Sequence, residues 1–406
     1  MSSKPHIAIL GAGPTGLEAA LAAHERGYPF TLYEAAPAVS DHVRAWGHVR
    51  LFSPWSLDVS PRARKALAAA GRELPDSAEC PTGAELCARV YDPLAALPTI
   101  AENLRLGVKV RAVSREGLLK NDEIGTGRRA ERPFRLLLGD GDGDGDGDDT
   151  GREWVETAGV VFDTTGTYGR PNATGDGGIP APGESSLGDL VERRIPDVLG
   201  LPEGWADRTT LLVGNGHSAQ TALVALARLA ERYPRTRIVW ALRDPEPSWP
   251  VDPDDPLPER SGLVARARDL AHGGSPAVET LTGVVIDRFE RRNGAVEVSL
   301  RTAGGEATSV EVDRVLSLTG FVGDHTLYRQ LQIHECYATS GPMKLAAALL
   351  GESSSDCLAQ TSHGADALVN PEPGFFILGS KSYGRNATFL LRQGWEQVDE
   401  VFGLLG

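Results

Sequence analysis

Two stretches of the chain share one order of apolar and polar positions. In the first, an apolar run at residues 6–10 precedes a glycine-rich turn, a helix predicted from about 15 to 26, and a second apolar run at 30–33. In the second, strands are predicted at 209–213 and 237–242 around a helix whose apolar residues recur every 3.6 positions. This strand–turn–helix–strand order predicts an α/β fold with two Rossmann-like dinucleotide-binding domains.

Alternating apolar and polar residues predict further strands. We expect strands at 132–138 and 153–162, joined by the aspartate- and glycine-rich run 139–149, and antiparallel strands at 284–300 and 310–318. The run at 139–149 alternates with a period of two, unlike the twelve-residue calcium loop or the nonapeptide calcium repeat. We therefore interpret it as a solvated hairpin loop.

The remaining segments contain many turn residues. Residues 173–204, rich in Gly and Pro, are typical of an interdomain connection, and 244–259 of a long surface loop. A strand at 375–378 and a helix from about Thr388 are expected at the end of the chain.

Composition and charge exclude several classes of protein. A chain of 406 residues has room for two to three domains. Its net charge of −14 does not suit a nucleic-acid binder, which needs clustered Lys and Arg. We find neither a secretory signal nor an apolar stretch near the roughly 20 residues of a membrane span, and the four scattered cysteines include no Cys-x-x-Cys pair. We expect a cytoplasmic protein with reduced thiols.

The first glycine-rich turn has the spacing of a dinucleotide-binding fingerprint. Gly11 permits the tight turn, Gly13 lets a diphosphate approach the backbone, and Gly16 lets the helix pack against the strand. Pro14 and Thr15 are further candidate contacts at the start of the predicted helix, whose amides and dipole would hold the phosphates. Glu34, at the end of the next strand, is the acid expected to accept hydrogen bonds from an adenosine ribose.

The second turn predicts a second nucleotide site. It contains Gly214, Gly216, His217, Ser218 and Ala219, and the fingerprint tolerates alanine at its third position. Arg243 follows the next strand, where an arginine would attract a 2′-phosphate. The sequence thus favours NADPH over NADH, with an ordinary surface arginine as the alternative for Arg243.

With these two motifs the chain resembles the two-dinucleotide-binding-domain flavoproteins, which include flavin-containing monooxygenases and thioredoxin reductases. Residues 160–166, ending in Thr165-Gly166, resemble the strand that leaves the FAD domain, and 313–320 resemble the second such segment. Residues 374–379 resemble the strand whose glycine, here Gly379, lies near the flavin ribityl and diphosphate. The resemblance implies FAD in a discontinuous domain of residues 1–172 and 319–406, and NADPH in an inserted domain of residues 173–318.

The chain also departs from this family in three respects. It lacks the cysteine pairs of disulfide reductases, and it lacks the Phe-x-Gly-x-x-x-His signature of the drug-metabolising monooxygenases. Ser380 stands where the family has an aspartate beside the ribityl chain. These departures argue against a disulfide reductase and favour a broader, monooxygenase-like flavoprotein.

Two segments supply further candidates. By resemblance, residues 46–55 run beneath the flavin, so Trp46, Arg50 and Ser53 are candidate FAD contacts; packing in the core is the alternative for the aromatic residues. The segment before the last helix would face the flavin, which makes its polar residues candidate catalytic or FAD-binding groups, with helix capping as the alternative. Tyr383, Arg385 and Asn386 are the catalytic candidates, and Thr388 is a candidate FAD contact. His363, near Cys357, is a further catalytic candidate.

The function implied is that of an FAD-dependent, NADPH-using oxidoreductase. We expect a monooxygenase that transfers one oxygen atom from O₂ to a small molecule through a peroxide adduct of the flavin. The alternatives are a flavin reductase or oxidase that passes electrons to a partner, a quinone or O₂, and a flavin-bound sensor without turnover. Neither the substrate nor the oligomeric state follows from the sequence, although homodimers are common among soluble enzymes. No metal site is predicted.

Overall fold

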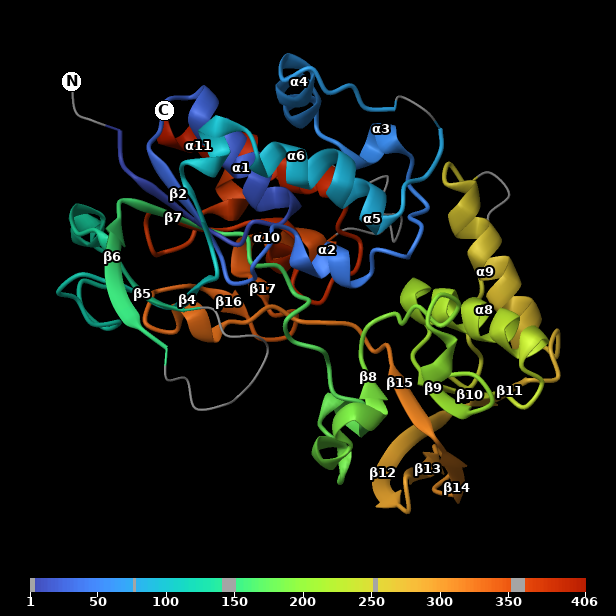
Figure 1. The fold of residues 1–406 in the computed structure, drawn as a ribbon. Helices are drawn as coiled ribbons and strands as arrows, with labels where there is room; N and C mark the ends of the chain where they lie inside the picture. Colours follow the sequence, from blue (N-terminus) through green and yellow to red (C-terminus); the bar gives the residue numbers. More distant parts are fainter. Residues whose placement is uncertain (1–3, 76–77, 141–150, 251–254, 352–361) are drawn as a thin grey trace. The chain divides into compact units, whose positions relative to one another are not determined.

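The computed structural model describes residues 4–75, 78–140, 151–250, 255–351 and 362–406 (Figure 1). The chain divides into two compact units. The first comprises Met1–Gly47, Pro54–Arg170 and Phe321–Gly406, and the second comprises His48–Ser53 and Pro171–Gly320. The chain thus passes between them after Arg170 and after Gly320, and the short segment His48–Ser53 groups with the second unit.

The first unit is built on a five-stranded parallel sheet. Its strand order is β18-β7-β1-β2-β3, with β1 in the centre paired to both β2 and β7. Fully buried aliphatic residues such as Ile7 and Ile9 explain why β1 occupies the middle of a sheet covered on both faces. The strands are β1 (Ile7–Leu10), β2 (Phe30–Glu34), β3 (Leu104–Leu106), β7 (Val160–Asp163) and β18 (Phe375–Ile377).

Neighbouring residues of β7 bury their side chains on opposite faces of this sheet. Phe162 packs edge-on against Phe402 of helix α11 (Leu391–Leu405), with ring centroids 5.4 Å apart. Val161 belongs to a core that includes Phe134 and Leu136 of an antiparallel sheet. That sheet contains β4 (Val108–Arg115), β5 (Phe134–Asp140) and β6 (Glu153–Ala158). Helix α1 (Pro14–Glu25) lies beside α11, so helices cover one face and the antiparallel sheet the other.

Short helices occupy most of the chain between β2 and β3. Several of them begin at a proline or a polar capping residue, and the capping box of Thr82 and Glu85 is an example. They are α2 (Asp41–Ala45), α3 (Trp55–Asp58), α4 (Pro61–Ala69), α5 (Gly83–Leu86), a π-helical turn (Cys87–Tyr91), α6 (Asp92–Ala95) and α7 (Pro98–Ala101). The C-terminal part of the unit adds β16 (Glu335–Cys336), β17 (Gly341–Pro342) and α10 (Met343–Gly351).

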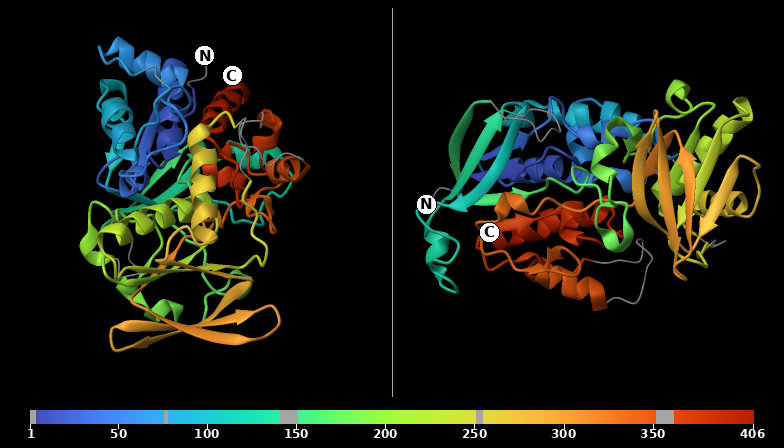
Figure 2. Two further views of the ribbon diagram at one scale, coloured as in Figure 1. Left: turned by 90° about the vertical axis from the view of Figure 1, so that its right-hand side faces the viewer. Right: turned by 90° about the horizontal axis from the view of Figure 1, so that it is seen from below.

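The second unit has three layers, and its own five-stranded parallel sheet is the middle one. Leu212 and Trp240 face a helical layer, whereas their neighbours Leu211 and Val239 face an antiparallel layer. Figure 2 shows that antiparallel layer, β12–β14, in orange. The parallel strands, in sheet order, are β11 (Val278–Thr282), β10 (Arg237–Leu242), β9 (Thr209–Val213), β15 (Arg314–Ser317) and β8 (Val191–Glu192). The other elements are α8 (His217–Arg232), α9 (Pro258–Ala271), β12 (Val284–Arg292), β13 (Ala295–Thr302) and β14 (Ala307–Val312).

Two predicted strands are wrong in extent because each contains a change of sheet. The strand expected at 153–162 ends at Ala158, and β7 begins after Gly159 in the parallel sheet. The strand expected at 310–318 divides at Asp313, so that β14 is antiparallel while β15 joins the parallel sheet. A continuous run of alternating residues does not reveal which sheet each half joins.

Two further predictions differ from the structure. The connection expected at 173–204 contains a strand as well, because β8 extends the parallel sheet of the second unit. The last helix begins at Leu391 instead of Thr388, because Asn386 and Thr388 form a hydrogen-bonded turn ahead of it. Most of the loop predicted at 139–149 lies outside the described residues.

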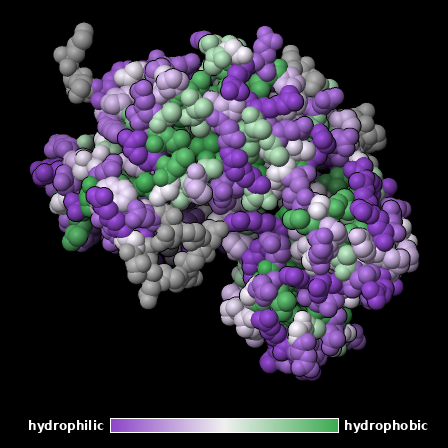
Figure 3. Space-filling model, in the orientation of Figure 1, coloured by the Kyte–Doolittle hydropathy of each residue, from purple (hydrophilic) through white to green (hydrophobic). Residues whose placement is uncertain are grey.

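The surface shown in Figure 3 mixes hydrophilic and hydrophobic residues. Within the described part of the chain, no helix combines the length and the apolarity that crossing a membrane requires.

Candidate functional site

The first glycine turn joins β1 to α1 and packs tightly on two sides. Gly11 has φ +95°, and a Cβ there would lie 2.9 Å from the carbonyl oxygen of Thr164. A Cβ on Gly16 would overlap the carbonyl oxygen of Gly11. Both positions therefore require glycine because backbone meets backbone there.

The N-terminus of α1 is open, in contrast. Gly13 is the N-cap residue and makes no side-chain capping bond, and no heavy atom lies within 4 Å of a Cβ placed on it. Pro14 begins the helix, one residue before the predicted start. A helix start with space beside its cap is suited to an anion such as a phosphate.

Glu34 lies against this turn. Its carboxylate accepts hydrogen bonds from the amide of Ala12 (2.8 Å) and that of Ala36 (3.0 Å). Burial raises the pKa of Glu34, and these backbone hydrogen bonds oppose that rise. The acid at the end of β2 therefore touches the glycine turn directly, at the position from which the fingerprint acid would bind a ribose.

The carboxyl ends of β7 and β18 meet the same turn. Thr164 donates its hydroxyl to the carbonyl oxygens of Leu10 and Gly11, so β7 is tied to the turn. Thr15, at the start of α1, lies where a Cβ on either Gly379 or Gly394 would come within 2.8 Å of its hydroxyl oxygen. The starts of α1 and α11 and the carboxyl ends of β1, β7 and β18 therefore meet at this turn.

The predicted contacts Thr165, Gly166 and Ser380 belong to this convergence. Gly166 has φ +70°, and the Ser380 hydroxyl would lie 3.6 Å from a Cβ placed on it. Thr165 donates its hydroxyl to Asp163, 2.7 Å away. The structure therefore brings together most of the residues predicted to bind the first nucleotide.

Lys381 is a member of this cluster that sequence reasoning missed. Its ammonium group donates to Asp163 at 2.6 Å and to Thr165 at 3.1 Å, and the Lys381 and Asp163 side chains are 1% and 0% exposed. It also lies 5.0 Å from the centre of the Tyr328 ring. A buried ion pair of this kind fixes the strand ends. A lysine just after a glycine that ends a buried strand is the only signal for it in the sequence.

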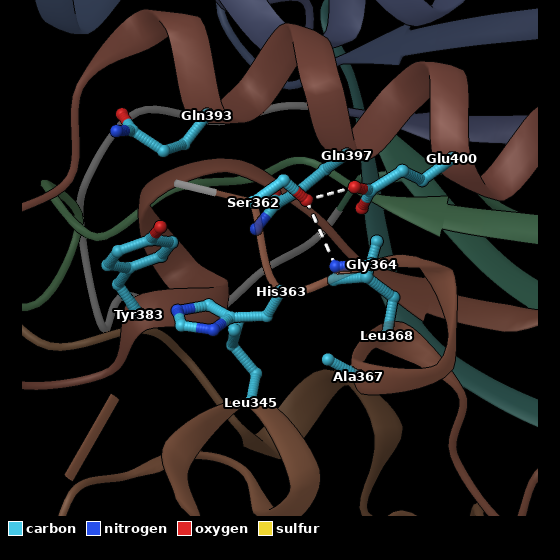
Figure 4. Close-up of a pocket in the computed structure, with 10 residues that line it drawn as sticks. All are labelled: Leu345, Ser362, His363, Gly364, Ala367, Leu368, Tyr383, Gln393, Gln397 and Glu400. Atoms are coloured by element: carbon cyan, nitrogen blue, oxygen red, sulfur yellow. Dashed lines mark hydrogen bonds between the residues drawn. The ribbon is translucent and has the colours of Figure 1, made fainter. Parts of the chain in front are cut away.

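His363 and Tyr383 line one small cavity of about 10 Å³ (Figure 4). Gln393 and Gln397 of α11 line it too, and Gln397 connects it to the strand end by accepting from the Gly379 amide at 2.8 Å. The volume suits a single water molecule. The structure therefore brings two of the four candidate catalytic residues together.

The other two candidates do not line this cavity. Arg385 is exposed and donates its backbone amide to Thr339, while the side-chain oxygen of Asn386 accepts from the amide and hydroxyl of Thr388. Asn386 and Thr388 therefore organise the turn before α11. Cys357, considered with His363, lies outside the described residues.

The segment expected beneath the flavin is divided between the two units. Trp46 lies in the first unit, where a Cβ on Gly83 would lie 2.7 Å from its ring, so it packs against α5. Arg50, which is exposed, and Ser53 belong to the second unit.

The second glycine turn repeats the first in the second unit. Gly214 has φ +121°, and a Cβ there would overlap the carbonyl oxygen of Leu318, while Ala219 is fully buried. Gly216 caps α8, with no heavy atom within 4 Å of a Cβ placed on it. The turn thus combines tight packing with an open helix start.

Two polar groups follow on α8, and a third lies beyond it. His217 and Ser218 are exposed, and the His217 ring meets Phe52 edge-on at 5.2 Å. Desolvation and the charge of Arg260 lower the pKa of His217. Arg243, at the end of β10, is exposed. In the described residues, no three His, Cys, Asp or Glu side chains gather as a metal site would need.

The chain has the fold of the two-domain FAD- and NAD(P)-binding flavoproteins, as the glycine motifs predicted. The bacillithiol disulfide reductase of Bacillus cereus shares 17% identity over 99% of both chains, with a TM-score of 0.70. The FAD-bound cadaverine monooxygenase of Erwinia amylovora shares 14% identity, covers 100% of this chain and 95% of its own, and has a TM-score of 0.67.

A third similar structure is the ornithine N-hydroxylase of Kutzneria sp. 744 with reduced FAD, NADP⁺ and L-ornithine. It shares 14% identity over 99% of both chains, with a TM-score of 0.63. No protein-family model matches the chain, and no curated protein matches it.

Proposed function

We propose that this protein is an NADPH-using flavoenzyme that binds FAD at the first glycine turn, and that it is a monooxygenase. The observation that carries the proposal is the first turn itself. Gly11 and Gly16 have no room for a side chain, yet Gly13 leaves the start of α1 open. The similar structures of a cadaverine monooxygenase with FAD and an ornithine N-hydroxylase with FAD and NADP⁺ support the choice of cofactors.

The residues of the first unit suit FAD. The amides at the start of α1 would hold the diphosphate, and the Glu34 carboxylate, already at the turn, would accept the adenosine ribose hydroxyls. Thr165 and Gly379 would flank the ribityl chain, with the Lys381–Asp163 pair keeping Thr165 in position. When bound, FAD would take a hydride from NADPH and deliver electrons to O₂.

The second unit suits NADPH. The start of α8 would hold its diphosphate, and Arg243 would bind the 2′-phosphate. Keeping two open glycine turns in one chain supports turnover over a flavin-bound sensor, which needs only the first.

The absence of a Cys-x-x-Cys pair from the sequence favours a monooxygenase over a disulfide reductase. The reductase alternative has its own support in the similarity to bacillithiol disulfide reductase. In both cases electrons pass from NADPH to FAD, so the two functions differ only in the final acceptor.

The test begins with the purified full-length chain. We expect it to retain FAD, identified after release by chromatography, and to oxidise NADPH faster than NADH. Oxygen uptake and hydrogen peroxide should then be followed with and without small amines and thioethers. A monooxygenase substrate lowers the peroxide formed per NADPH and gains one oxygen atom by mass spectrometry.

Other outcomes assign other functions. NADPH oxidation that accelerates only with a disulfide or a quinone would identify the reductase. Bound FAD that NADPH never reduces would leave the sensor, and a chain that takes up no FAD would contradict the whole proposal.

A further inference from the structure

An arginine outside every sequence motif lies beside the second glycine turn. Arg260 is the third residue of α9, which packs along α8 (Figure 1). Asp255 binds its guanidinium twice, with Nε–Oδ2 and Nη2–Oδ1 distances of 2.9 and 2.8 Å. The two side chains are only 15% and 7% exposed, so the planar guanidinium is fixed in place.

The position of this pair relative to the turn follows from the sheet: β9 and β10 are neighbouring parallel strands, α8 follows β9 and α9 follows β10. Both helices therefore begin at the carboxyl edge of the same sheet, and they pack against each other, so the third residue of α9 lies at the same edge as His217, the first residue of α8. The charges of both Arg260 and Asp255 act on the ionisation of His217, in opposite directions. Such interactions weaken with distance, so this coupling agrees with the position that the sheet gives the ion pair.

A buried polar side chain near the start of α8 independently indicates a ligand. Gln220 is 6% exposed and donates its Nε2 to the carbonyl oxygen of Asn215, between the two glycines, at 3.0 Å. Its Oε1 is also buried and has no hydrogen-bond partner among the described residues. An unpartnered buried acceptor costs free energy, so a ligand donor such as a ribose hydroxyl would satisfy it.

We propose that Arg260 binds the diphosphate of a nicotinamide dinucleotide at the start of α8, with Asp255 as the counter-charge that holds it when the site is empty. The inference rests on the proposed NADPH site and adds a residue and a specificity to it. The diphosphate is common to NADPH and NADH, so Arg260 supplies affinity for both. Arg243, at the end of β10, supplies the preference for the 2′-phosphate.

Calorimetric titration of the full-length protein with NADP⁺ and with NAD⁺ separates these roles. Arg260→Gln should weaken the binding of both nucleotides by a similar factor of about 10 to 100, the effect of losing a charge-assisted hydrogen bond. Arg243→Gln should weaken NADP⁺ alone. Arg266→Gln removes the same charge from an exposed position on α9 and should leave both affinities unchanged.

Asp255→Asn separates a ligand role from a structural one. We expect it to keep at least the wild-type affinity for both nucleotides, because it removes the competing carboxylate and leaves the guanidinium. If the pair only supports the fold, Asp255→Asn and Arg260→Gln should lower the melting temperature and both affinities together, which would overturn the proposal.

Two other results would also overturn the inference. Unchanged affinities in Arg260→Gln would remove Arg260 from the site, and a loss confined to NADP⁺ would assign it to the 2′-phosphate. In both cases the wild-type protein still binds nucleotide, so the proposed function stands. A wild-type chain that binds neither nucleotide would contradict the proposed NADPH site and this inference with it.

Discussion

At the scale of single residues, Cys87 and Cys336 have opposite surroundings and should differ in reactivity. Burial raises the pKa of Cys87 to about 11. Cys336 is partly exposed, and hydrogen bonds from the Thr339 hydroxyl and amide lower the pKa of its thiol. The thiolate is the reactive form, so the same reagent at the same pH should discriminate between them.

We predict that iodoacetamide modifies Cys336 well before Cys87 in the native protein near pH 8. The rate at Cys336 should rise as the pH increases through its lowered pKa, whereas Cys87 should stay protected until the protein unfolds or the pH nears 11. Peptide mapping by mass spectrometry follows each site, with urea-unfolded protein as the control in which both react. Equal rates in the native protein would contradict the assigned environments.

Residues differed in how far the sequence predicted them. Gly11, Gly16 and Glu34 were predictable because a fixed local spacing requires them. Lys381 lies 218 positions from its partner Asp163, so only the fold brings the two together. Arg260 was missed because the arrangement of α8 and α9 sets its distance from the second turn.

At the scale of elements, Gly16 and Gly13 serve different purposes between β1 and α1. A side chain on Gly16 collides with β1's turn whether or not a ligand is present, because backbone lies there. A side chain on Gly13 meets no protein atom and has an ordinary φ of −77°. Packing within the protein therefore does not explain a glycine at position 13, whereas a bound ligand would.

We predict that Gly16→Ala lowers both stability and FAD content, whereas Gly13→Ala keeps the wild-type melting temperature of the FAD-free protein but loses FAD. Thermal unfolding of the FAD-free forms and flavin absorbance of the purified proteins measure the two effects. Gly127→Ala, at another open position of the first unit without a positive φ, is the control and should change neither the melting temperature nor the FAD content. Retention of FAD by Gly13→Ala would remove the diphosphate from the start of α1.

Elements with a strong local pattern were predicted well. β10 has the predicted bounds, and α1 begins and ends one residue before the expected positions. The helices between Asp41 and Ala101 were not predicted, since most span only four or five residues and show no full period. The breaks at Gly159 and Asp313 were missed because pairing between distant strands decides them.

At the scale of the whole molecule, a buried cluster of Glu372, Arg115 and Arg129 joins distant parts of the chain. Glu372 is fully buried between two arginines, 2.7 Å from Nε of Arg115 and 2.9 Å from Nη2 of Arg129, both 1% exposed. Glu372 also accepts from the amide of Gln332 at 2.9 Å. One carboxylate thus holds together β4, the segment after it and the residues before β18.

We predict that Glu372→Gln lowers the free energy of unfolding by about 3–5 kcal/mol, because two buried guanidinium groups lose their only anion in this cluster. Glu123→Gln is the matched control: its exposed pair with Arg128 lies in the same segment, and its loss should cost less than about 1 kcal/mol. Urea unfolding followed by tryptophan fluorescence measures both. The Asp163–Lys381 pair and the glycine turn share this unit's sheet, so unfolding of the Glu372→Gln protein should release FAD in the same transition. Similar small losses in the two variants would mean that packing around the cluster, and not its charge, keeps this unit folded.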